Sequence, residues 1–353
     1  MNENRQNGYW SDYARVLANK QRETDDYKKL LFILSMSVIG VTVIVQAAAF
    51  CIAMLLPVFP GHPDWAFFIS KLDIGSSAIE AEDLAYLFMW LANDIAVYIP
   101  PLLVYGLIFR NRFEHREPVA PYVFKGFWVI PFFLAGIAIA TGSSILTTLI
   151  TDLFSGFSGG EDVLPDVFRD VMPENNAQLL IMFLTVGIIA PICEEIIYRH
   201  ILLKPLRRFG DLQAVIITSV LFGFFHGNLT QLLYAAMVGI ILGIAAVRAN
   251  SVVPAIIIHM LNNVFVVFSS HLTAMSQRGE TALGETALGV LNITILLLGV
   301  AALVIMAVNN MLSVFNYNPY ISQEERVKII CRRPSVFAMA AFLLLITILG
   351  SLV

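Results

Sequence analysis

Charged residues are scarce in this sequence. They make up 14% of its 353 residues, against roughly 25% in a typical soluble domain. Hydrophobic residues make up 58%, the mean hydropathy is +0.76, and the apolar residues fall in long runs. A helix needs about 20 consecutive apolar residues to cross the hydrocarbon layer of a bilayer. The composition therefore excludes an ordinary soluble protein and predicts an all-α fold, a polytopic bundle of transmembrane helices.

Cysteine is also rare, and its spacing argues against two kinds of site. Cys51, Cys193 and Cys331 lie far apart and form no CxxC pair, so we expect neither a disulfide framework nor a cysteine-based metal site. The net charge of −4 argues against a nucleic-acid partner. The first 29 residues are polar, so we expect no cleavable signal peptide and a first apolar run that stays in place as a span.

Apolar runs between charged or Pro/Gly-rich breaks predict about eight or nine spans, with nine as the working count. The predicted spans are 30–56, 84–109, 127–152, 177–203, 211–226, 230–247, 252–269, 287–310 and 336–353. The fifth is the shortest, and the breaks around it are tight.

Lys and Arg are unevenly distributed over the predicted loops. Short cytoplasmic loops retain these residues. With the N-terminus inside and each span crossing once, the cytoplasmic segments hold 18 of the 22 Lys and Arg residues, and the opposite side holds three. This asymmetry predicts a cytoplasmic N-terminus. The acidic outer loops at 57–83 and 153–176 are interpreted as solvated connectors.

The ionisable residues within the predicted spans are grouped. Each costs at least about 2.5–3.5 kcal/mol to insert. Glu195 and Arg199 are four residues apart and share one helix face, where they can form an ion pair. Glu194 is rotated by about 100° from Glu195, which leaves it as the free carboxylate and a candidate general base. The alternative is an interfacial charge cluster near the cytoplasmic end of the span.

Two further motifs follow on separate predicted spans. Phe222-Gly-Phe-Phe-His226 places a histidine at the end of an apolar run, where it can be a ligand or an interfacial residue. His259 and Asn263 are four residues apart. They can hold a metal-bound water or donate to a developing oxyanion, or they can simply join two helices. Together the three motifs predict a hydrolytic site.

These motifs resemble those of the CPBP family, intramembrane proteases related to type II CAAX prenyl endopeptidases and bacterial Abi proteins. The family pattern is EExxxR, then FxxxH, then HxxxN, each on its own helix. Residues 194–199, 222–226 and 259–263 match it in that order. The resemblance covers about residues 177–270 and includes a Gly239-xxx-Gly243 helix. That GxxxG pattern is interpreted as tight packing within the chain.

The resemblance implies an endopeptidase in which Glu194 and His226 activate a water. His259 and Asn263 would then stabilise the oxyanion or complete a metal site. A Zn²⁺ ion would be held by Glu194, His226 and His259, although a metal-free glutamate mechanism is also argued for the family. The sequence has no HExxH motif, so any metal site has to be assembled between helices.

The expected organisation has four parts: a cytoplasmic polar tail (1–29), N-terminal spans with acidic outer loops (30–176), a catalytic bundle (177–270) and a C-terminal extension (271–353). The expected function is hydrolysis of a peptide bond in a membrane-associated protein or peptide. The substrate would be of the CAAX type or the bacteriocin or leader-peptide type, and the location a bacterial plasma membrane.

Two other functions are compatible with the polar cluster. A non-catalytic membrane scaffold or regulator would keep it for packing. A proton-coupled transporter would use Glu194 and the histidines as a relay. An inverted repeat in hydropathy would favour the transporter, but the first three spans carry only Asp94 near their middle.

The predicted depth of His226 conflicts with a shared site. Glu194 and His259 lie toward the cytoplasmic side, whereas a straight crossing of 211–226 would bring His226 near the outer face. We expect this span to be tilted or to start outside the hydrocarbon, because Pro205 and Gly210 weaken the helix before it.

Overall fold

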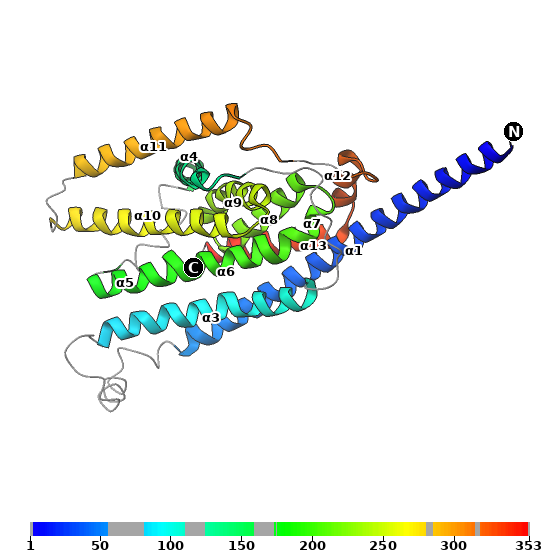
Figure 1. The fold of residues 1–353 in the computed structure, drawn as a ribbon. Coiled ribbons are helices and arrows are strands. Elements are labelled where there is room, and N and C mark those ends of the chain that lie inside the picture. Colours follow the sequence, from blue (N-terminus) through cyan, green and yellow to red (C-terminus); the bar gives the residue numbers. More distant parts are fainter. Residues whose placement is uncertain are drawn as a thin grey trace.

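The computed structural model describes residues 3–55, 81–109, 124–158, 173, 175–279, 285–314 and 318–351. Every regular element in these ranges is helical (Figure 1). Seven helices are long and apolar enough to cross a membrane, and one bent pair raises the number to eight. The chain is therefore a multi-pass membrane protein with an all-α fold, as predicted.

Most helices follow the predicted spans. The long uninterrupted helices are α1 (Glu3–Leu55), α3 (Ala81–Phe109), α4 (Val129–Ser158), α9 (Leu229–Ala249), α10 (Val253–Gln277) and α11 (Glu285–Val308). A short 3₁₀ turn, Gly126–Trp128, precedes α4. The polar residues before position 30, predicted as a cytoplasmic tail, form one continuous helix with the first span, and the N-terminal end of this helix projects beyond the rest of the fold (Figure 1).

The fourth span is one continuous helix in which α-helical and π-helical hydrogen bonding alternate along the chain. It runs through α5 (Asn176–Leu184), a π-helical segment (Thr185–Ile189), α6 (Ala190–Glu195), a second π-helical segment (Ile196–Leu202) and α7 (Leu203–Arg207). Segments of π-helix occur frequently at functional sites. The second one contains Arg199, and the glutamate pair lies directly before it.

The helices at the fifth and ninth predicted spans begin and end within three residues of the predicted bounds, but neither is a long straight span. Helix α8 (Asp211–Phe225) has 15 residues, about 22 Å at 1.5 Å per residue, which is short of a hydrocarbon layer of about 30 Å. Helix α13 (Pro334–Gly350) joins α12 (Gln323–Cys331) at a bend of 65°. The working count of nine separate spans is therefore too high for the described residues.

Basic residues from distant segments meet at one end of the bundle. Their contacts are Arg208 with Glu23 and Asp26, Arg207 with Asn250, Arg248 with the carbonyls of Asn310 and Ser313, and Lys20 with Glu325. These segments are ones that the charge distribution assigns to the cytoplasm, so their assignment to a common side is consistent with the fold. The orientation of the N-terminus relative to the membrane stays a prediction.

The predicted acidic loops lie mostly outside the described residues, so their role as connectors stays a prediction. Their described ends approach each other between α3 and α5. The side-chain amides of Asn175 and Gln178 donate to Asp83 Oδ1 at 2.8 and 3.2 Å. Asp83 is buried, so these bonds compensate its loss of hydration.

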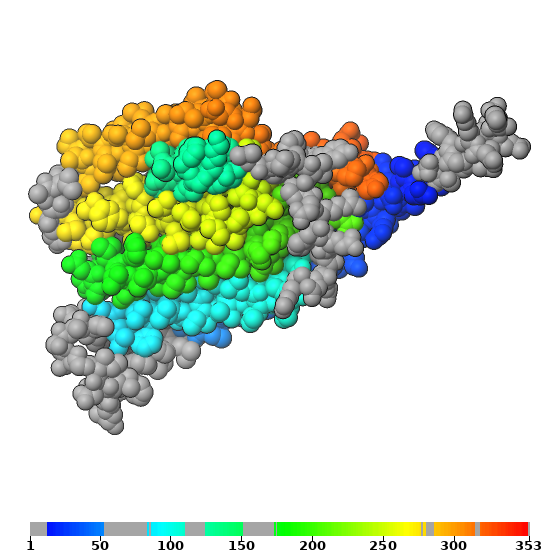
Figure 2. Space-filling model, in the orientation of Figure 1, coloured from blue at the N-terminus to red at the C-terminus, as the bar shows by residue number. Residues whose placement is uncertain are grey.

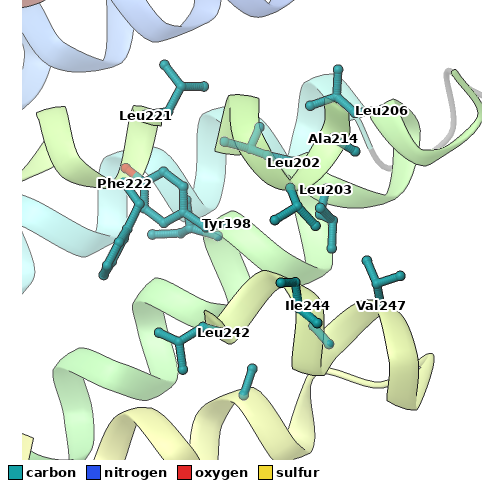
Figure 3. Close-up of a cluster of buried hydrophobic side chains, with 14 of the residues drawn as sticks. Tyr198, Leu202, Leu203, Leu206, Ala214, Leu221, Phe222, Leu242, Ile244 and Val247 are labelled. Atoms are coloured by element: carbon teal, nitrogen blue, oxygen red, sulfur yellow. The ribbon is translucent and has the colours of Figure 1, made fainter. Parts of the chain in front are cut away.

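Close helix packing surrounds the central region. Helix α4 packs between α10 and α11 (Figure 2). Helices α8 and α9 also lie close together: a Cβ on Gly223 would be 2.5 Å from the Leu232 carbonyl oxygen, and one on Gly243 would be 2.9 Å from Val215 Cγ1. The Gly239-xxx-Gly243 pattern therefore serves packing within the chain, as predicted. Figure 3 shows the buried apolar cluster at this junction, with Tyr198 beside Phe222.

Candidate active site

The predicted ion pair is present and buried. Arg199 Nε donates to Glu195 Oε2 at 3.1 Å, and neither side chain is exposed to solvent. The Nη1 atom of Arg199 donates to Thr218 Oγ1 on α8 at 3.3 Å. Its guanidinium carbon also lies 5.4 Å from the centre of the Phe222 ring, within the range of a cation–π contact. The pair thus links the fourth span to α8.

Glu195 has a second partner that helical spacing did not predict. Its Oε1 atom lies 3.1 Å from His259 Nδ1 on α10. A carboxylate can only accept a hydrogen bond, so this contact places a proton on Nδ1. The other ring nitrogen, Nε2, faces Glu194, at 3.6 Å from Oε2. Glu195 therefore orients the His259 imidazole so that its Nε2 atom faces Glu194.

Glu194 has surroundings unlike those of Glu195. It is 6% exposed, and its Oε1 atom accepts a hydrogen bond of 2.8 Å from the Tyr98 hydroxyl on α3. None of the Lys and Arg side chains that the structure describes forms an ion pair with it. The predicted difference between the two glutamates is therefore present: one is paired with arginine and the other is not.

His226 follows the last residue of α8 and lies near the same cluster. Its Nδ1 donates to the Phe222 carbonyl at 2.9 Å, which leaves Nε2 as an acceptor. The Phe222 ring contacts both imidazoles edge-on, with centroid distances of 5.0 Å to His226 and 5.6 Å to His259. Glu194 is close enough to interact electrostatically with His226. His226 lies at the end of α8, and the shared contacts with Phe222 bring it near His259, so the motifs come together despite the predicted difference in depth.

Asn263 has a well-defined structural contact. Its Nδ2 donates to the Val186 carbonyl at 2.9 Å. In the π-helical segment the Ala190 amide bonds to Thr185 O, so the next amide in the same pattern would bond to Val186 O. Residue 191 is proline, which has no N–H. Asn263 therefore supplies the donor that Pro191 lacks, and its role at an oxyanion stays a prediction.

The three predicted zinc ligands do not come together as a metal site. Among the described residues, no three His, Cys, Asp or Glu side chains are grouped closely enough to hold one ion. His259 Nδ1 faces the Glu195 carboxylate and His226 Nδ1 faces a backbone carbonyl, so Nε2 is the free ring nitrogen of each histidine, as it would also be in a metal-bound imidazole. Zinc binding by Glu194, His226 and His259 stays a prediction.

Two buried polar residues are not among the positions that the three motifs specify. Tyr98 contacts Glu194 directly. Asn262 is 8% exposed, and neither of its amide atoms has a hydrogen-bond partner among the described residues. Tyr98 lies outside the three matched segments, and Asn262 occupies an unspecified position of the third motif. The weak signal available was the position of Tyr98, four residues after Asp94 and hence on the same face of a predicted span.

Residues 176–265 match the family model described as type II CAAX prenyl endopeptidase Rce1-like. This segment is Rce1-like. It contains all three motifs, which supports the assignment to the CPBP family made from the sequence.

One curated protein supports the same assignment. It is the membrane-embedded CAAX protease MroQ of Staphylococcus aureus (strain USA300), which is 26% identical over 147 residues. That match covers 40% of this chain and 58% of the relative, less than two thirds of its length. No solved structure matches the chain. Tyr98 lies outside the Rce1-like segment.

Proposed function

We propose that the protein is an intramembrane endopeptidase that hydrolyses a peptide bond of a membrane-associated protein or peptide. The observation that carries the proposal is the buried Glu194 carboxylate, which has no arginine or lysine partner among the described residues and faces His259 Nε2 at 3.6 Å. Retaining such a carboxylate for packing alone would be costly. The same features suit a general base, and the Rce1-like match supplies the class of reaction.

In the proposed reaction, Glu194 removes a proton from water while the water oxygen attacks the carbonyl carbon of the scissile bond. His226 Nε2 accepts the second hydrogen bond of that water and orients it. Glu194 then passes its proton to the leaving nitrogen as the C–N bond breaks. The products are a carboxylic acid and an amine, so atoms and charge balance.

His259 is proposed to stabilise the oxyanion that forms on the substrate carbonyl oxygen. This requires a proton on Nε2, and the Glu195 carboxylate at Nδ1 stabilises the resulting imidazolium. Arg199 in turn fixes Glu195. Asn263 holds the π-helical segment through its bond to the Val186 carbonyl. A direct hydrogen bond from Asn263 to the oxyanion is proposed from the family resemblance alone.

No step of this reaction needs a metal. Zinc held by Glu194, His226 and His259 remains the alternative. We expect peptide cleavage to persist after incubation with a strong chelator and dialysis, because carboxylate and imidazole groups alone supply the base and the donor. Loss of activity on chelation, with recovery on adding Zn²⁺, would contradict the metal-free mechanism.

The substrate is proposed to be a CAAX-type C-terminus or a leader-type peptide presented at a bacterial cell membrane. The first source follows from the name of the family model and of the staphylococcal relative. A direct comparison uses purified protein in liposomes with three peptides: a prenylated CAAX peptide, the same peptide without the prenyl group, and a leader-type peptide.

The control in that assay is Glu194→Ala. Wild-type protein should cleave at least one of the three peptides, and the variant should cleave none while unfolding at a similar temperature. Equal cleavage by both proteins would contradict the catalytic assignment and leave a scaffold as the better account.

A further inference from the structure

We infer that α3, which lies outside the Rce1-like segment, supplies a positioning residue for Glu194: the hydroxyl group of Tyr98 fixes the orientation of the carboxylate. The inference rests on the proposed function, because positioning matters only if Glu194 acts on water. It extends the site to a helix about 90 residues earlier in the chain, and the Tyr98–Glu194 bond spans 96 positions.

The bond joins two buried groups. Tyr98 is 7% exposed and Glu194 is 6% exposed, and the hydroxyl donates to Oε1 at 2.8 Å. In such surroundings a hydrogen bond is stronger than in water. The Tyr98 ring is itself held in place, with its centroid 6.0 Å from that of Phe225, the residue before His226. Tyr98 thus lies between the proposed base and the end of α8.

The contacts of Glu194 divide its two oxygens. Oε1 accepts from Tyr98, and Oε2 faces His259 Nε2. The terminal torsion of a glutamate is broad, so without Tyr98 the carboxylate could rotate away from the imidazoles. With the Tyr98 hydroxyl bonded to Oε1, the Oε2 atom of Glu194 is held in a fixed direction from which it can accept a proton. Misplacement of a reacting group by about 1 Å can reduce a rate by about 100-fold.

Another polar group on the same face of α3 does not take this role. Asp94 lies one turn before Tyr98 and is 8% exposed, and its Oδ2 atom has no hydrogen-bond partner among the described residues. A carboxylate also cannot donate to Glu194 when both are ionised. The positioning contact from α3 therefore belongs to Tyr98.

The alternative is that the bond only joins α3 to the fourth span. The two roles give different results for Tyr98→Phe, which removes a single oxygen atom. A positioning role predicts that kcat falls by about 10- to 100-fold while KM stays near the wild-type value, because substrate contacts remain. A purely structural role predicts a lower unfolding temperature and an unchanged kcat for the folded protein.

Tyr105→Phe is the matched control. Tyr105 is 4% exposed and lies two turns further along α3, and the described residues show no hydrogen bond from it to Glu194. Removing its hydroxyl should leave kcat unchanged. Steady-state cleavage by both variants is measured in liposomes, with unfolding temperatures recorded on the same preparations.

The outcomes separate the two proposals. If Glu194→Ala abolishes cleavage but Tyr98→Phe retains full kcat, the role of Tyr98 is overturned and the proposed function stands. If Glu194→Ala cleaves as well as wild type, the proposed function fails, and the role of Tyr98 fails with it. A fall in kcat of similar size in Tyr98→Phe and Tyr105→Phe would also overturn the inference, because it would show a general response of α3.

Discussion

Glu194 and Glu195 are neighbours in the chain, and helical geometry alone separates their roles. A rotation of about 100° per residue puts Glu195 on the face of Arg199 and leaves Glu194 on another. This much followed from the sequence. The contacts of Glu195 with His259 and of Glu194 with Tyr98 did not follow, because they depend on how α10 and α3 pack against the fourth span.

At the residue scale, Arg199→Met tests the buried pair. The change leaves Glu195 without its cation in a fully buried position, and breaking such a pair typically costs about 3–5 kcal/mol of unfolding free energy. The control is Lys328→Met, which removes an exposed pair with Glu324 at the same spacing and should cost less than about 0.5 kcal/mol. Denaturant unfolding in detergent gives both values, and equal losses would contradict the account.

At the element scale, two irregularities build the site. Pro191 interrupts the hydrogen-bond pattern of the fourth span, and Asn263 on α10 satisfies the carbonyl left open. Helix α8 has only 15 residues, and His226 lies at its C-terminal end beside Phe222. Apolar run length predicted the bounds of this helix to within one residue, but it also predicted a crossing span, because run length does not report how a short helix lies within a bundle. Its short predicted length, and Pro205 and Gly210 before it, were the signs of an irregular span.

The contact between α8 and α9 gives a second prediction at this scale. In Gly223→Ala, the new methyl group would lie 2.5 Å from the Leu232 carbonyl oxygen and 2.9 Å from Ala236 Cβ. The backbone cannot move away without shifting His226, so we expect a loss of about 1–3 kcal/mol in stability together with lower activity. The matched change Gly106→Ala meets no atom within 4 Å and should be neutral or stabilising by up to about 1 kcal/mol. Similar unfolding temperatures for the two variants would show that α8 and α9 are not closely packed.

At the scale of the whole molecule, the distribution of Lys and Arg predicts the side of the membrane on which each end lies. The hydrogen bonds of Arg207, Arg208 and Arg248 gather the predicted cytoplasmic segments at one end. Helix class and approximate spans were predictable because apolar run length reports them directly. The number of crossings was not, because a short helix and a bent pair have the same apolar composition as straight spans.

Cysteine labelling checks the orientation. Cys331 is exposed on α12, at the end of the bundle where the basic residues meet. Thr286 is exposed at the N-terminal end of α11, at the other end of the bundle. In one variant Cys51 and Cys193 are replaced by serine, and in a second Cys331 is also replaced and Thr286→Cys is added. An impermeant maleimide applied to intact cells should label the second variant and not the first. The reverse pattern would place the N-terminus outside.

The central claim is that Glu194 is the base in peptide hydrolysis, and the most direct measurement is the kcat of Glu194→Gln in liposomes. Glutamine keeps the size of the side chain and an acceptor for Tyr98 but cannot take a proton from water. Removing a general base lowers a rate by about 100- to 10,000-fold, and we predict a loss in that range with an unfolding temperature close to that of wild type. Glu324→Gln changes an exposed side chain on α12 and should have no effect. A Glu194→Gln protein with a kcat close to that of wild type would contradict the account.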